Sequence, residues 1–176
     1  MNEIQQKQVA MHKDFFDRCR LAINEGFYME AILMEYAAME SRLEIILGVV
    51  GLPCNNNLES GLRVSINISH RICCVKWLVQ NSPLFEASKL DKEFFDKLKN
   101  WTVERNKYVH GLYKNEGMYE QRKEEAGALA ENGLEYCRLL YNETRRLRRF
   151  IEKNAELLSC SIACHSKQCK LWREKE

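Results

Sequence analysis

The chain has 176 residues, of which 45% are hydrophobic and 30% are charged, and its formal net charge at pH 7 is +2. This length suits a single domain with a core of its own, and so small a net charge does not by itself indicate a nucleic-acid-binding protein. The longest apolar run, residues 45–52, contains two glycines. It is much shorter than the roughly 20 apolar residues that a membrane helix needs, so no membrane span is predicted.

Apolar residues recur at steps of three and four along most of the chain, and only 8 glycines and 2 prolines interrupt it. Together these features predict long helices. The first helix is expected over about residues 3–24, with a stop at Glu25-Gly26. The second starts near Tyr28 and ends at Gly48 and Gly51-Leu52-Pro53, because glycine accepts left-handed caps and proline cannot continue a helix.

Further helices are expected in the rest of the chain. One covers about residues 62–80, although residues 64–69 alternate in polarity like a strand. The next begins at Leu90-Asp91, with Asp91 as its N-cap, and reaches about residue 112. The last runs from about residue 126 to residue 158, and its interior Gly127 and Gly133 each cost about 1 kcal/mol relative to alanine.

These elements predict an all-α fold, an antiparallel bundle of four to five helices. The bundle is expected over residues 1–158, followed by a helical extension or tail over residues 159–176. Residues 1–6 are polar and lack the layout of a secretory signal, so a cytoplasmic protein is expected. A bundle specifies no function, so function has to be argued from a site.

The chain contains 8 cysteines. Because a reducing compartment argues against disulfides, most of them are expected to pack as small hydrophobic side chains. A group near the C-terminus contains the ligands that zinc prefers, namely Cys160, Cys164, His165 and Cys169. The usual two-residue ligand spacing is absent from it, so a solvated tail is the favoured interpretation and no metal or other cofactor is predicted.

The side chains with the clearest chemistry lie near the end of the fourth expected helix. Trp101, Arg105 and Tyr108 fall on one helical face, so that Arg105 interrupts an apolar seam. A desolvated guanidinium at such a place needs a carboxylate, carbonyl groups or a phosphate opposite it. Asn106 and His110 lie four residues apart and share a neighbouring face. Arg105 and His110 lie about 140° apart on an ideal helix.

This set of side chains suits cleavage of a phosphodiester bond in RNA without a metal. Histidine titrates near neutral pH, so His110 could take the proton of a 2′-hydroxyl or give one to the departing 5′-oxygen. Arg105 could hold the phosphate and stabilise its developing charge, and Asn106 could orient either group. One histidine hardly serves as both acid and base in a single turnover. The chemistry therefore predicts a symmetric homodimer that brings two such segments together.

Residues 105–113, Arg-Asn-Lys-Tyr-Val-His-Gly-Leu-Tyr, resemble the Arg-polar-x(3–5)-His signature of HEPN domains. These domains are helical bundles, commonly dimeric, and many are metal-independent endoribonucleases of toxin–antitoxin and phage-defence systems. The acidic, apolar-rich residues 30–44 are similar in style to the helix that precedes the family's motif. The resemblance implies an endoribonuclease that acts on RNA, has an antitoxin protein as a partner, and uses Arg105, Asn106 and His110 in its active site.

Lys107 and Tyr113, together with Arg145 and Arg149 of the last helix, are the candidate substrate-binding residues. Some toxins of the family carry His-x-Tyr, whose tyrosine is nucleotidylated by the paired antitoxin. Here Tyr113 lies one residue farther from the histidine, so the sequence leaves this regulation open. The basic stretch 145–149 could contact RNA phosphates, but neighbouring glutamates favour a solvated helix face.

The spacing of the motif is weak by itself, because Arg63 and His70 also satisfy its loose form. One alternative is therefore purely structural. In it, Arg105 pairs with a carboxylate such as Glu35 or Glu40. His110 then only occupies a helix end, where the helix dipole favours a cation.

In a second alternative the fold is the same, but the protein has no catalytic activity. In it, a catalytically inactive HEPN-like module binds a protein or a nucleotide, and the apolar stripe over residues 140–151 mediates assembly. Substitution of His110 distinguishes the two readings, because it would abolish RNA cleavage by an enzyme and leave an interaction module unaffected.

Overall fold

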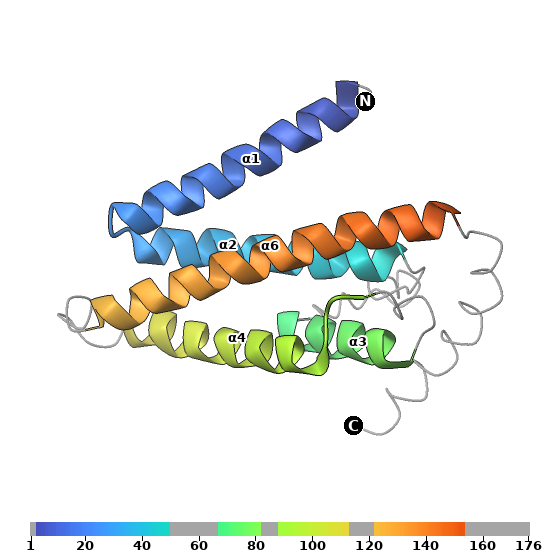
Figure 1. The fold of residues 1–176 in the computed structure, drawn as a ribbon. Helices are drawn as coiled ribbons and strands as arrows, with labels where there is room; N and C mark the ends of the chain where they lie inside the picture. The colour runs from blue at the N-terminus through green and yellow to red at the C-terminus, as the bar shows by residue number, and fades with distance from the viewer. Residues whose placement is uncertain (1–2, 50–66, 82–87, 113–121, 154–176) are drawn as a thin grey trace, which may run out of the picture. The chain divides into compact units, whose positions relative to one another are not determined.

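The computed structural model describes residues 3–49, 67–81, 88–112 and 122–153. Every regular element in these ranges is a helix (Figure 1). The helices are α1 (Glu3–Asn24), α2 (Tyr28–Val49), α3 (Ile68–Asn81), α4 (Lys92–Leu112) and α6 (Lys123–Lys153). The predicted all-α helical bundle is thus confirmed as a fold class for the described residues. None of their helices is both long enough and apolar enough to cross a membrane.

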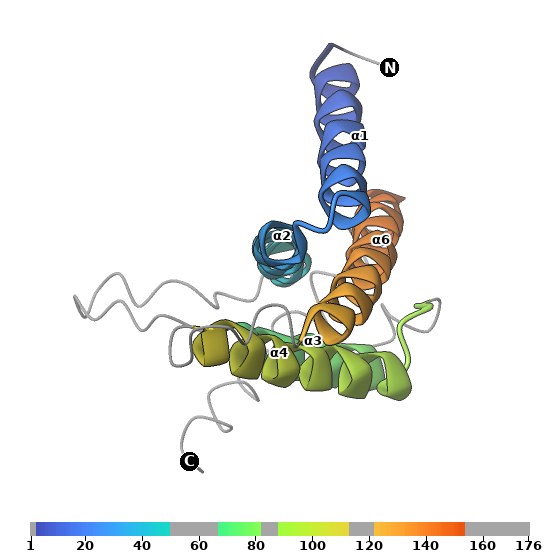
Figure 2. The same cartoon turned by 90° about the vertical axis from the view of Figure 1, so that its left-hand side faces the viewer.

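The predicted ends of the first two helices agree with the structure. Gly26 has φ +80°, a left-handed conformation in which glycine is favoured. It allows Phe27 N to donate to Ala22 O at 2.8 Å and Gly26 N to donate to Ile23 O at 3.1 Å, the pattern of a Schellman cap. The short link between α1 and α2 is visible in Figures 1 and 2.

The predicted start of α4 is also confirmed, since Phe94 N donates to Asp91 Oδ1 at 2.8 Å. α6 begins three residues earlier than expected, at Lys123, and its first turn includes the hydrogen bond from Ala126 N to Arg122 O at 2.9 Å. α3 is described from Ile68 onward. Its expected first residues, 62–66, and the expected last residues of α6, 154–158, lie outside the described residues.

Replacing Asp91 by alanine is expected to lower the free energy of unfolding by about 1 kcal/mol, because the amide of Phe94 loses the acceptor that caps the helix. Asp91→Asn keeps an acceptor oxygen and should retain most of the stability. Urea-induced unfolding followed by circular dichroism measures both changes. Lys89→Ala, at an exposed position just before the helix, is the control. Equal stability of Asp91→Ala and Lys89→Ala would contradict the capping role.

The described helices contribute to two compact units. The first unit comprises Met1–Met39 and Asn100–Arg138, and the second comprises Glu40–Lys99 and Leu139–Glu176. α2, α4 and α6 each supply one segment to both units. The structure therefore divides the chain within its long helices, and the boundary expected at residues 158–159 lies outside the described residues.

The core of the first unit is built from α1, the start of α2, the end of α4 and the start of α6. Its buried side chains include Cys19, Ile32, Trp101, Tyr108 and Leu134. The indole of Trp101 also donates from Nε1 to the carbonyl of Leu129 at 2.8 Å, which ties α4 to α6 without leaving a buried polar group unsatisfied.

The second unit has its own apolar core, to which Leu43, Ile72, Phe95, Leu98 and Leu140 contribute. Ion pairs join its helices at the edge of this core. Arg71 Nη1 lies 3.3 Å from Glu40 Oε1 and 3.6 Å from Glu44 Oε2. Lys76 Nζ pairs with Asp96, and this hydrogen bond is the main reason why the pKa of Asp96 lies below its ordinary value.

The described cysteines behave as expected from the sequence. Cys19 and Cys137 are buried, Cys73 and Cys74 are half-buried, and none of these four forms a disulfide bond within the described residues. Burial, with a smaller contribution from Glu35, raises the pKa of Cys19 to about 12, so this thiol stays protonated and inert at neutral pH. Cys160, Cys164, His165 and Cys169 lie outside the described residues, and the described residues contain no group that could hold a metal ion.

Candidate functional site

The segment 105–110 forms the last turns of α4, in the first unit. Tyr108 is buried and Arg105 is half-buried, while Asn106, Lys107 and His110 are exposed. The helix thus turns Trp101 and Tyr108 into the core and its polar residues toward solvent. The prediction that Arg105 interrupts an apolar seam agrees with this arrangement.

The guanidinium of Arg105 is held by an aromatic ring. Its Cζ lies 4.1 Å from the centroid of the Tyr36 ring, which is close for a cation–π contact. Its Nη1 donates to Asn106 Oδ1 at 2.9 Å, whereas its buried Nε has no hydrogen-bond partner in the part of the chain that the structure describes. A ring face attracts a cation without neutralising its charge, so this arginine keeps its positive charge available to an anion.

The expected pairing of Arg105 with Glu35 is not formed. The two carboxyl oxygens of Glu35 are buried and have no hydrogen-bond partner within the described residues. Glu40, the other acid considered, belongs to the second unit, where Arg71 lies beside it. The adjacent residue on α2, Tyr36, takes the position opposite the guanidinium, which the sequence periodicity alone did not indicate.

His110 is exposed in the last turn of α4, where the helix dipole favours a cation. The structure brings Arg105 and Asn106 into direct contact. Within the described ranges, His110 forms no hydrogen bond with either of them. This agrees with the large angle that an ideal helix places between Arg105 and His110, so a single chain does not assemble the three side chains into one cluster.

The candidate substrate-binding residues are distributed over the chain. Lys107 Nζ lies 2.7 Å from Glu104 Oε1 in an exposed ion pair, the kind of pair that contributes little stability and exchanges readily with solvent. Arg145 and Arg149 are exposed on α6 in the second unit. The Cζ of Arg145 lies 5.8 Å from the ring centroid of Tyr141. Tyr113 lies outside the described residues.

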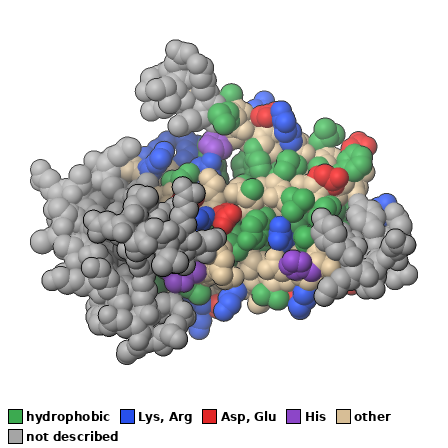
Figure 3. Space-filling model, turned by 180° about the vertical axis from the view of Figure 1, so that it is seen from behind, with side chains coloured by type: hydrophobic (Ala, Val, Ile, Leu, Met, Phe, Trp, Pro, Cys, Tyr) green, Lys and Arg blue, Asp and Glu red, His purple; other side chains and the backbone are tan. Residues whose placement is uncertain are grey.

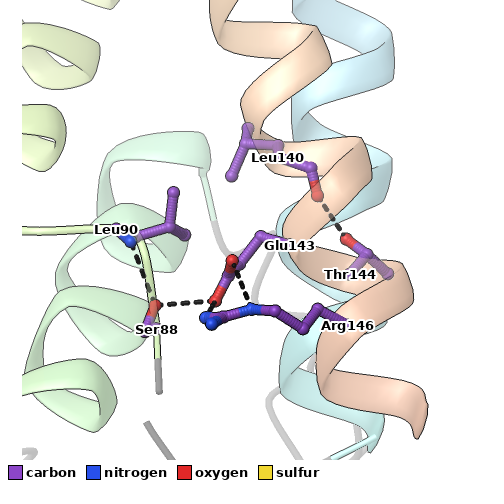
Figure 4. Close-up of polar contacts among 6 residues, drawn as sticks. All are labelled: Ser88, Leu90, Leu140, Glu143, Thr144 and Arg146. Carbon is purple, nitrogen blue, oxygen red and sulfur yellow. Dashed lines mark hydrogen bonds and ion pairs between the residues drawn. The ribbon is translucent and has the colours of Figure 1, made fainter. Parts of the chain in front are cut away.

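One arginine of the basic stretch, Arg146, forms an ion pair with a buried glutamate (Figure 4). Arg146 pairs with the buried carboxylate of Glu143, to which it donates from Nε at 3.1 Å, and Ser88 Oγ donates to the same carboxylate at 2.7 Å. Glu143 therefore pairs with one of the four arginines in the basic stretch. Arg146 therefore compensates a buried charge in the second unit and is not a candidate for RNA binding.

A buried acid is the least expected polar feature of the first unit. Glu35 is 0% exposed. Burial, followed by repulsion from Glu131, raises its pKa to about 9, so the carboxyl group is protonated at neutral pH. Space for it comes from Gly133 of α6, where a Cβ would overlap Glu35 Oε2 and lie 2.8 Å from Trp101 Cζ2. Gly133, predicted only as a costly interior glycine, thus leaves room for the side chains of Glu35 and Trp101.

Arg122 is a second cation at the His110 end of α4, and it was not among the site residues predicted from the sequence. Its Nη1 lies 3.4 Å from the position that a Cβ of Gly111 would take. Its Cζ lies 5.6 Å from the centroid of the Tyr108 ring, and its Nε donates to Glu125 Oε2 at 2.7 Å. The contact with Gly111 joins residues separated by the segment 113–121, so no local pattern in the sequence signals it.

Comparison of the chain with protein-family models, with curated proteins and with solved structures found no match.

Proposed function

We propose that the protein is a homodimeric, metal-independent endoribonuclease of the HEPN type, with His110, Arg105 and Asn106 at its active site. The observation that carries the proposal is the exposed imidazole of His110 at the end of a helix that also carries the guanidinium of Arg105, for which the described residues provide no carboxylate partner. Such a guanidinium suits a phosphate, and an exposed imidazole at this place is open to a nucleic-acid backbone.

The proposed reaction is an internal transfer at phosphorus. The 2′-oxygen of a ribose attacks the adjacent phosphorus as it loses its proton to one imidazole, and the 5′-oxygen leaves as it gains a proton from another. The products are a 2′,3′-cyclic phosphate and a 5′-hydroxyl. His110 of one protomer serves as base and His110 of a second protomer as acid, while Arg105 stabilises the charge on the non-bridging oxygens.

The test is cleavage of RNA by the purified protein in the presence of a chelator. His110→Ala should lower the cleavage rate by about 100-fold or more, the usual contribution of a positioned acid or base. His70→Ala is the matched control, because His70 satisfies the same loose motif with Arg63 but lies on α3 in the second unit. Equal loss of activity in the two variants, or full activity of His110→Ala, would sink the proposal.

The same assay tests the composite site. Addition of excess His110→Ala protein to the wild type should depress cleavage per wild-type chain, because each mixed dimer holds only one functional imidazole. Sedimentation of the wild type should show a dimer. Activity that is proportional to the wild-type concentration, whatever amount of variant is present, would contradict a site shared between protomers.

A catalytically inactive interaction module is the second candidate, and exposed hydrophobic side chains favour it. Met11, Leu21 and Phe27 are 71%, 61% and 56% exposed. Figure 3 shows one face of the molecule, on which hydrophobic side chains reach the surface between charged ones. The stripe 140–151 does not provide this surface, because Leu140 and Leu147 are buried in the second unit. The module would lose partner binding when Leu21 is changed and would be indifferent to His110→Ala.

A further inference from the structure

Arg122 lies at the same end of α4 as His110. Its Nη1 lies 3.4 Å from the position that a Cβ of Gly111 would take, and the Cα of Gly111 is about 3.8 Å from that of His110 by chain geometry. Arg105, by contrast, precedes His110 by five residues, about 7.5 Å along the helix axis, and its guanidinium faces Tyr36 and Asn106. Of the two arginines, Arg122 is the one whose guanidinium lies in the space beside Gly111, the residue that follows His110.

The surroundings of Arg122 hold its guanidinium in place without using all of its donors. The side chain is 24% exposed and lies over the Tyr108 ring, which limits its freedom. Within the described residues only Nε is engaged, by Glu125, whose side chain is 66% exposed. An exposed carboxylate is well solvated and binds weakly, so an RNA phosphate can compete with it for the same guanidinium.

The glycine at position 111 is part of this arrangement. A Cβ there would lie 3.4 Å from Arg122 Nη1, at the limit of a comfortable contact, so any larger side chain would push the guanidinium aside. Glycine in a helix costs about as much stability here as elsewhere, and its presence lets the arginine approach the backbone beside His110.

We propose that Arg122 is a phosphate-binding residue of the site at the end of α4, and that it holds the RNA backbone beside His110. The inference rests on the proposed function, since it takes RNA as the ligand of this site. Arg122 supplies a cation beside Gly111, while Arg105 supplies a second cation about one and a half turns before His110 on the same helix. In the absence of RNA, Glu125 accepts a hydrogen bond from the guanidinium, and a bound phosphate displaces it.

The test separates binding from cleavage. The probe is a fluorescent single-stranded RNA with 2′-O-methyl groups, which lacks the nucleophile and cannot be cut, and its dissociation constant is measured at several salt concentrations. Arg122→Ala should weaken binding about tenfold at low salt, and the slope of log K against log salt should fall by about 0.7, the value for one lost phosphate contact on a single strand. Arg122→Lys should restore the slope, because it restores the charge.

Two controls are matched to these variants. Arg18→Ala removes one arginine from an exposed ion pair with Asp14 on α1 and should leave the slope unchanged. Glu125→Gln should tighten binding of the probe by several-fold, because it frees Arg122. Glu135→Gln, which removes the same charge from the same helix at the pair with Arg138, should tighten it less.

The outcomes distinguish this inference from the proposed function. If the wild type cuts unmodified RNA and Arg122→Ala behaves as Arg18→Ala does, Arg122 does not bind phosphate and the inference is overturned while the enzyme stands. If the wild type cuts no RNA, the proposed function is overturned, and the salt slope of probe binding still decides the role of Arg122. A wild type that does not bind the probe overturns both.

Discussion

Replacing Gly133 by alanine is expected to lower the free energy of unfolding by about 2 kcal/mol. The added methyl group would overlap the carboxyl of Glu35 and lie 2.8 Å from Trp101 Cζ2, so these two buried side chains would have to shift. Overpacking of this kind costs about 1–3 kcal/mol or more, which outweighs the roughly 1 kcal/mol that alanine gains over glycine in a helix.

Gly127→Ala is the matched control on the same helix. Its Cβ would meet the ring of Tyr28 at 3.3 Å, and Tyr28 is only half-buried, so its ring can shift. This variant should be neutral or more stable than the wild type, since only the helix propensity changes. Urea unfolding of both variants provides the comparison, and equal effects at the two positions would contradict the close approach described for Gly133.

A double substitution tests whether Glu35 is the cause. In a Glu35→Ala background the overlap with the carboxyl is removed and the close approach to Trp101 remains, so Gly133→Ala should cost less there than in the wild type. The coupling free energy should reach about 1 kcal/mol or more, as for other residues in direct contact. Additive effects of the two substitutions would show that Glu35 is not what excludes a side chain at position 133.

Glu35→Gln is expected to stabilise the protein by about 3 kcal/mol at pH 7 and to flatten the dependence of its stability on pH. The pKa of Glu35 is about 9 in the folded chain and near 4.5 in the unfolded chain. Between these values the folded state binds more protons than the unfolded state, so the stability of the wild type falls as the pH rises from 4.5 toward 9. The interval from 4.5 to pH 7 corresponds to about 3 kcal/mol.

The measurement is the free energy of unfolding in urea at several pH values between 4.5 and 9. The two curves should approach each other near pH 4.5, where the wild-type carboxyl is protonated in the folded state and half protonated in the unfolded state, and separate progressively above it. Glu30→Gln, which neutralises an exposed acid on the same helix, should follow the wild type. A constant offset between wild type and Glu35→Gln at all these pH values would mean that Glu35 is not protonated in the folded protein.

The local parts of the fold could be predicted from the sequence. The helix bounds near Glu25-Gly26 and at Asp91 depend on φ preferences and on side-chain hydrogen bonds to nearby amides, which are properties of a few consecutive residues. The helical spacing of Trp101, Arg105 and Tyr108 likewise predicted that an arginine lies on a largely buried face, because the periodicity of a helix determines which residues share a face.

What the sequence left open is which groups from different helices meet. It offered Glu35 as a partner for Arg105, whereas the structure places Tyr36 there and leaves Glu35 buried without a hydrogen bond. The two residues are adjacent on α2 and point in directions about 100° apart, so the outcome depends on how α2 is rotated relative to α4. No pattern within one helix specifies that rotation.

The candidate site divides in the same way. The sequence by itself determined that Arg105, Asn106 and His110 lie on one helix and that Arg105 and His110 point apart, because both follow from helical periodicity. Only the tertiary structure decided that Arg122 lies beside Gly111 and that Gly133 makes room for Glu35. Such contacts join residues that are not neighbours in the sequence. They form because a glycine has no side chain, so a side chain from another segment occupies that space.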